Sequence, residues 1–109
     1  MNNKRLELHE ILCEIINITE PDGNRHVYFQ PPESVKMKYP CIRYSSDGFD
    51  VVRADDKVYR YVKRYEGVII DPNPDSITPE FMLMHFPMCD IGSSYTADNL
   101  NHYPFTLYY

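Results

Sequence analysis

The last fifteen residues, Tyr95 to Tyr109, constrain the fold more than any other segment. They read as a strand, a polar turn over 97–101, and a second strand that reaches the last residue of the sequence. Four of the last seven residues are aromatic: Tyr103, Phe105, Tyr108 and Tyr109. Chain ends usually carry little apolar surface unless they are held in place. We therefore expect this segment to be docked, either in the protein's own sheet or against a neighbouring subunit.

The composition is that of a single globular domain spanning residues 1–109, with 43% hydrophobic and 25% charged residues. The formal net charge of −5 disfavours nucleic-acid binding through a general basic surface. Ten tyrosines and no tryptophan fit either a protein interface or simply a strand-rich chain.

Localisation is constrained by the absence of targeting signals. No apolar run approaches the roughly 20 residues needed to cross a bilayer, and the first residues lack a signal-peptide pattern. We therefore expect no membrane partner. The odd number of widely spaced cysteines, namely Cys13, Cys41 and Cys89, indicates reduced thiols in a cytoplasm.

The first two elements are predicted from apolar spacing and turn residues. An apolar stripe from Leu8 to Ile16 predicts a helix over 4–17, and 21–24 form a strong turn signal. A short strand over 27–30 follows, and Pro31-Pro32 stop it at a sheet edge.

Two further strands are predicted in the central part of the chain. The first covers 40–45 and ends at an Asp47-Gly48 turn, after which 49–56 read as a polar loop. The second covers 58–70, with its tyrosines on one face and its arginines largely on the other.

The second half begins with a sheet break over 71–75 and a short helix over 79–85, with Thr78 as N-cap. A strand over 88–95 with an irregularity at 92–94 precedes the final strand. The fold class is therefore α+β, a mostly antiparallel sheet on which an N-terminal helix and a second short helix pack.

No residue pattern for catalysis, cofactor binding or metal binding is recognised. His9 with Cys13, and His85 with Cys89, are spaced four apart but form no paired zinc-ligand cluster. The serines lie outside a nucleophile-elbow context, and most aspartates fall in predicted turns as solvated groups. The basic residues around 53–64 are interleaved with tyrosines, which favours a half-buried strand over single-stranded nucleic-acid binding.

Several segments, taken together and in order, resemble the tail completion or tail terminator proteins of long-tailed bacteriophages. They are Val27-Tyr-Phe-Gln-Pro-Pro-Glu-Ser34, Met37-Lys-Tyr-Pro-Cys-Ile42, Tyr65 to Asp75 with the following Ser76, Met88-Cys89, and Tyr95-Thr-Ala-Asp-Asn-Leu-Asn-His102. The segment 81–85 is more apolar than such a family would have there, which is consistent with a partner-specific surface.

The resemblance implies a virion structural protein of the tail and neck that is assembled in the host cytoplasm and is not an enzyme. It implies a tail-terminator-like domain that forms a homo-oligomeric, typically hexameric ring at the head-proximal end of the tail tube. Its partners would be the tail tube protein and a head–tail connector or neck protein. DNA would pass through the lumen without specific binding.

Candidate oligomer or partner contacts come from three regions. The polar stretches 31–38 and 46–57 are expected to make axial contacts, and the aromatic final strand is expected to serve sheet or subunit packing. The residues are Tyr95, Tyr103, Phe105, Tyr108, Tyr109, Arg60, Arg64, Glu33, Lys36, Lys38, Arg53, Asp55 and Asp56.

Two alternatives stay open. A head-side neck protein, either a head-closure or an adaptor subunit, would also form a ring. A small phage enzyme or host-directed inhibitor would find its best support if Cys41, His85 and Cys89 converged in one pocket.

Overall fold

The computed structural model describes residues 4–19, 26–32 and 34–109, and at 58 and 59 it describes the backbone alone. The described elements run in the order α1 (Lys4–Thr19), β1 (Val27–Phe29), β2 (Cys41–Ala54), β3 (Lys57–Asp71), α2 (Thr78–His85), β4 (Cys89–Ile91), β5 (Tyr95–Ala97) and β6 (Leu100–Tyr108). The turn predicted at 21–24 lies outside the described residues.

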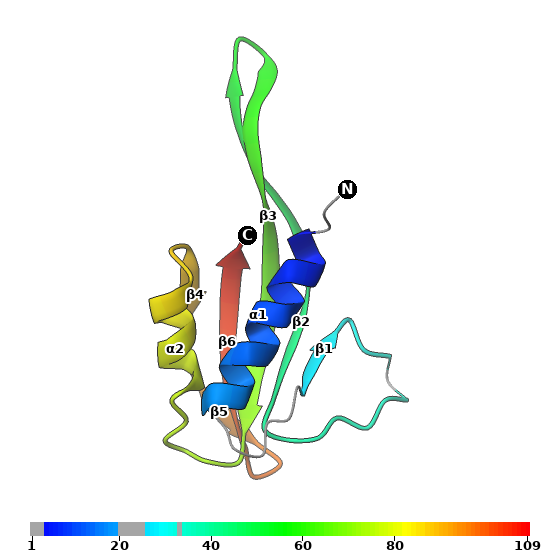
Figure 1. The fold of residues 1–109 in the computed structure, drawn as a ribbon, viewed down its shortest axis with the longest axis vertical. Coiled ribbons are helices and arrows are strands. Elements are labelled where there is room, and N and C mark those ends of the chain that lie inside the picture. The colour runs from blue at the N-terminus through cyan, green and yellow to red at the C-terminus, as the bar shows by residue number, and fades with distance from the viewer. Residues whose placement is uncertain (1–3, 20–25, 33) are drawn as a thin grey trace.

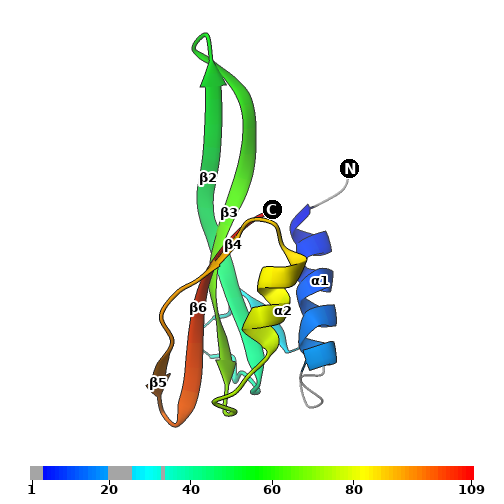
Figure 2. The ribbon, with the colours of Figure 1, turned by 90° about the vertical axis from the view of Figure 1, so that its left-hand side faces the viewer.

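The described strands form one sheet with the order β1-β2-β3-β6-β4, and β5 also pairs with β6. All pairs are antiparallel except β1 with β2, which is parallel. Both helices lie on the same face of the sheet (Figures 1 and 2). The predicted α+β class and its mostly antiparallel sheet are therefore confirmed.

The main core lies between the helices and this covered face of the sheet. From α1, Leu8, Leu12 and Ile16 are fully buried against side chains of β2, β3 and β6. Phe105 on β6 is 3% exposed and lies opposite Gly67 on β3. A Cβ atom at Gly67 would stand 2.5 Å from the Phe105 aromatic ring and 2.4 Å from the Arg43 carbonyl oxygen. The bare backbone at Gly67 is therefore what admits the phenyl group.

The sheet face without helices is here called the open face. It is covered only at the end where β2 begins and β3 ends. There Cys41, Val68 and Ile70 form a second buried cluster, against which Met37 and Leu100 pack. The backbone N–H of Lys38 donates a hydrogen bond to the Tyr28 hydroxyl at 3.0 Å, which helps to hold the 34–40 segment across this face.

The C-terminal strand lies inside the sheet. β6 pairs with β3 over eight residue positions and with β4 and β5 on its other side. The N–H of Tyr109 still donates to the Lys63 carbonyl at 3.0 Å. Of the two outcomes that the sequence left open for this segment, docking in the protein's own sheet is the one observed.

The prediction for 46–57 was wrong. Instead of a turn and a polar loop, β2 continues to Ala54 and pairs with β3 as far as Lys57. Gly48, with φ +93°, lies at a register shift between Ser46 and Phe49 and does not end the strand. Residues 47–63 therefore form a two-stranded arm that projects beyond the body, and the molecule measures 51 × 29 × 26 Å (Figure 1).

Two local predictions were only partly right. Thr78 begins α2 but does not cap it: its buried hydroxyl shares a 2.7 Å hydrogen bond with the Thr19 hydroxyl on α1. The irregularity predicted at 92–94 is observed, but it divides the predicted strand 88–95 into two short strands, β4 and β5.

Because Phe105 fills the space over Gly67, we expect Phe105→Ala to lower the free energy of unfolding by about 3–5 kcal/mol. The matched control is Thr106→Ala, which changes the neighbouring half-buried side chain on the opposite face and should cost about 0.5 kcal/mol. Urea titration followed by circular dichroism measures both. Equal midpoints for the two variants would contradict this account of the core.

Candidate assembly surfaces

Among its described side chains, the arm exposes its aromatic residues on one of its two faces. In the register of the arm, Phe49 lies opposite Lys63, and Val51 lies opposite Tyr61. Cross-strand partners share a face of the sheet, and residues two apart along a strand do so as well. Phe49 is 55% exposed and Tyr61 is 64% exposed, and their aromatic rings meet edge-to-face at 5.8 Å.

We call this surface the arm face and define it by Phe49, Val51, Arg53, Tyr61 and Lys63. Its charged members are the exposed Arg53 and Lys63. Among the described side chains of the arm, the carboxylates lie elsewhere: Asp50 shares the opposite face with Val62, and Asp55 and Asp56 form the turn at the tip. The arm face is therefore both apolar and cationic.

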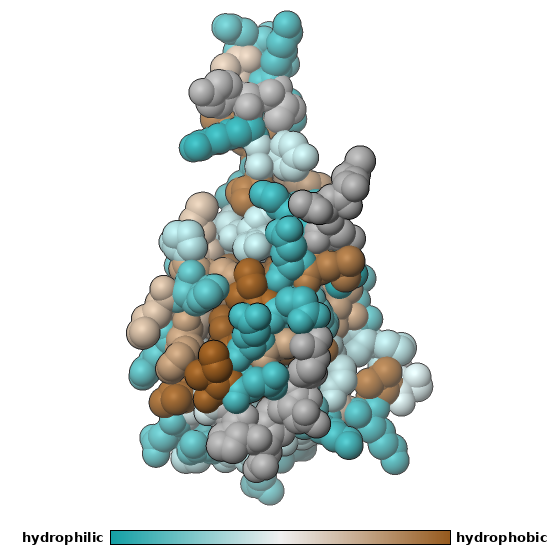
Figure 3. Space-filling model, viewed as in Figure 1, coloured by the Kyte–Doolittle hydropathy of each residue, from teal (hydrophilic) through white to brown (hydrophobic). Residues whose placement is uncertain are grey.

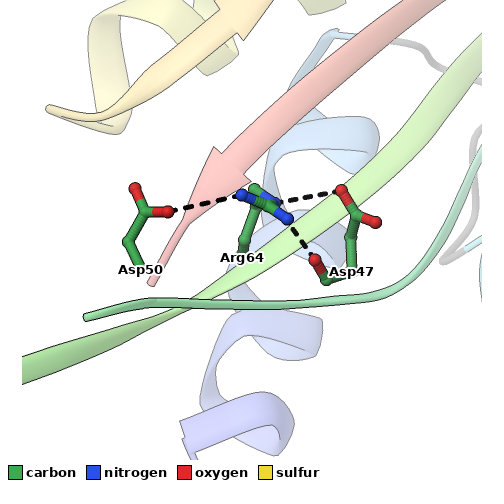
Figure 4. A network of polar contacts seen from close by, with 3 residues as sticks. All are labelled: Asp47, Asp50 and Arg64. Atoms are coloured by element: carbon green, nitrogen blue, oxygen red, sulfur yellow. Dashed lines mark hydrogen bonds and ion pairs between the residues drawn. The ribbon is translucent and has the colours of Figure 1, made fainter.

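Arg64 organises the root of the arm (Figure 4). Its Nε donates to the Asp47 carbonyl oxygen at 3.0 Å and to the Asp47 carboxylate at 3.1 Å. Its Nη1 donates to the Asp50 carboxylate at 3.3 Å. The hydrogen bond with Asp47 and the nearby carboxylates raise the pKa of Arg64 above its already high value. These contacts join β3 to both sides of the register shift at Gly48, where the arm leaves the body.

The predicted contact residues are distributed over separate regions. Arg53, Asp55, Asp56 and Arg60 are exposed on the arm, and Lys36 and Lys38 are exposed on the segment before β2. Glu33 lies outside the described residues. Phe105 is buried, so it serves sheet packing and presents no surface to a partner.

The remaining predicted aromatic residues lie on β5 and β6. Tyr103 and Tyr109 are half-buried against the main core, and the Tyr103 hydroxyl donates to the Pro74 carbonyl at 3.0 Å. Tyr108 is half-buried as well. Tyr95 is 53% exposed and stacks on His102 with ring centroids 4.7 Å apart.

Sequence reasoning missed a cavity on the open face, which has a volume of about 700 Å³. Its lining includes Val68 and Pro104, two exposed carboxylates and one arginine; these last three are Glu66, Asp90 and Arg43. The signal available was the alternation along 64–70, which places Glu66 and Val68 on the face opposite Tyr65.

The set of residues that would have supported an enzyme is not brought together. Cys41 belongs to the cluster on the open face, whereas Cys89 packs against the main core on the covered face. His85 is exposed and contacts the Phe86 aromatic ring edge-to-face. Burial raises the pKa of the Cys41 thiol to about 12 and that of the Cys89 thiol to about 11. At neutral pH both are therefore held as thiols, the form that is not nucleophilic.

The other titratable groups form no candidate centre. Within residues 4–19, 26–32 and 34–109, no three His, Cys, Asp or Glu side chains gather closely enough to hold a metal ion. Asp71, grouped with the solvated turn acids in the sequence, is instead 1% exposed and accepts a hydrogen bond from the Asn73 N–H at 2.8 Å. None of the described helices is long and apolar enough to span a membrane.

Comparisons with protein-family models, with curated proteins and with solved structures found no significant match to this chain. Its function is therefore argued from its own residues and geometry.

We expect Arg64→Ala to loosen the root of the arm because both ion pairs are lost. Hydrogen exchange of amides at 49–63 should then accelerate, while amides of α1 and β6 keep their rates. The control is Arg60→Ala, which removes an exposed arginine of the same strand, four residues closer to the tip of the arm. Equal exchange in both variants would show that Arg64 does not hold the arm.

We also expect the cysteine thiols to react slowly with a thiol reagent at pH 8. With pKa values of about 12 and 11, Cys41 and Cys89 should label at least about a hundredfold more slowly in the native protein than in urea. As the pH rises toward 11, the Cys89 thiolate should form first. Rapid native labelling of Cys41 at pH 8, located by mass spectrometry, would contradict this and favour an enzyme.

Proposed function

We propose that this protein is a structural subunit of a bacteriophage virion that forms a ring at the head-proximal end of the tail tube. There it ends tube polymerisation and joins the tail to the head connector. The observation that carries the proposal is the projecting arm with its unpartnered apolar face. A ring subunit that binds the tail tube on one side and the head connector on the other needs exposed contact surfaces more than it needs a reactive group.

The arm itself supports an assembly role. An isolated two-stranded ribbon is at best marginally stable in water. Here residues 49–62 have backbone pairing only within the ribbon, and Phe49 and Tyr61 are more than half exposed. A second element packed on this ribbon would bury those side chains and remove the cost of exposing them. Monomeric function offers no such gain.

The subunit has two different candidate contact surfaces, the arm and the open-face cavity, and this difference supports a ring. The arm leaves the body at one end, and the open-face cavity lies on another side, so a contact between copies would join two different surfaces. Such heterologous contacts close into rings when the rotation between copies permits it. Six copies would carry a formal charge of about −30, which would let DNA pass without retention by counterion release.

The resemblance to tail terminators supports the same proposal from the sequence. Its segments fall on β1 and the residues after it, the start of β2, the second half of β3 and the β5–β6 hairpin. These are elements of the body. The arm lies outside them, as expected for a part that is adapted to a particular neighbour.

The test is to purify the protein and examine it by native mass spectrometry and negative-stain imaging, alone and mixed with the cognate tail tube protein. We expect closed rings, and rings seated on one end of each tube. A protein that stays monomeric both with and without tail tubes would contradict the proposal. Rings that bind emptied heads and ignore tubes would assign the chain to the head side of the neck.

A further inference from the structure

We propose that the arm of each subunit docks in the open-face cavity of the next copy in the ring. The inference rests on the proposed ring function and names the contact that would close it. The occupant of the cavity is thus a second copy of this chain, and the inserted surface is the arm face.

Exposed apolar area on the arm is the first argument. Phe49, Val51 and Tyr61 are contiguous on one face and are 55%, 41% and 64% exposed. Aromatic side chains that enter a pocket on a partner supply most of the binding energy in typical interfaces. Tyr61 and Phe49 are placed to act as such anchors because the arm holds them clear of the body (Figure 2).

The second argument is the shape and chemistry of the cavity. About 700 Å³ is room for several side chains, and Val68 and Pro104 give it an apolar wall. Glu66 and Asp90 place carboxylates among its lining residues, against one arginine. The cavity and the arm lie on different parts of one rigid subunit, so an arm cannot fill the cavity of its own chain.

Charge complementarity is the third argument. Arg53 and Lys63 lie on the arm face, and Glu66 and Asp90 line the cavity. Opposite charges at the edge of an apolar contact favour the correct pairing and raise the association rate. The helix layer offers exposed apolar side chains too, and brown surface gathers low on the two helices in Figure 3.

Two complementary variants test the contact. The arm variant carries Tyr61→Ala with Lys63→Ala, and the cavity variant carries Glu66→Lys with Asp90→Lys. Each should associate with itself at least tenfold more weakly than the unchanged protein. Mixed in equal amounts, they should form heterodimers and no rings, because only the arm of the cavity variant can enter the cavity of the arm variant. Analytical ultracentrifugation and native mass spectrometry report these species.

Matched controls separate docking from folding. Arg60→Glu changes charge on the opposite face of the arm, and Glu80→Lys changes an exposed acid on α2 outside the cavity; both should form rings. Far-UV circular dichroism and urea midpoints establish that each variant is folded. If the arm variant unfolds, Arg53→Ala with Lys63→Ala, which alters only exposed side chains, replaces it.

The outcomes also separate this inference from the proposed function. Rings formed by either variant alone, or a mixture that stays monomeric, would overturn arm docking while leaving ring formation intact. An arm variant that forms rings but no longer binds tubes would place the arm on the tube and overturn the inference too. Rings that close through the arm but bind no tube would instead remove the proposed function and keep the docking.

Discussion

Strand β3 joins the two parts of this molecule, and the packing of both depends on it. Over Tyr65 to Ile70 it pairs with β2 on one side and β6 on the other, and Tyr65 and Ile69 are buried under the helices. Beyond Lys63 the same strand leaves the body with β2 as its only partner. The hydrophobic core thus anchors an element that could not hold its own shape in water. Arg64, at the junction, ties the strand to Asp47 and Asp50 where β2 changes register.

Much of the fold could be predicted because apolar spacing and turn chemistry agreed. The stripe on α1 and the dense aromatic pattern of β6 each have one natural solution, which is burial against a sheet. The arm could not be predicted in the same way. Gly48 suggested a chain reversal, but a positive φ also suits a register shift within a continuing strand. The true reversal uses Asp55 and Asp56, both with positive φ, where a glycine would ordinarily mark the turn.

The candidate site was harder to predict than the fold, for a physical reason. Interface residues are exposed, so local periodicity constrains them weakly and only tertiary structure brings them together. Phe105 and Tyr95 looked equivalent as aromatic residues of one hairpin, yet one is buried and the other is half exposed. The cavity draws residues from separate strands, and nothing in the sequence joins Glu66 to Asp90. Cys41 and Cys89 likewise lie on opposite faces of the sheet, which local periodicity around each cysteine does not reveal.

The continuity of β3 between core and arm couples folding to assembly. A chain whose body has not folded has no sheet from which an arm can extend, so it offers neighbours no aromatic anchors in the right geometry. Conversely, any partner that binds the arm binds only the native state and draws the folding equilibrium toward it by mass action. Incorporation into a particle would then select for correctly folded copies without a separate checking step. In the proposed ring, a single long strand would make correct folding of each subunit a condition for adding the next.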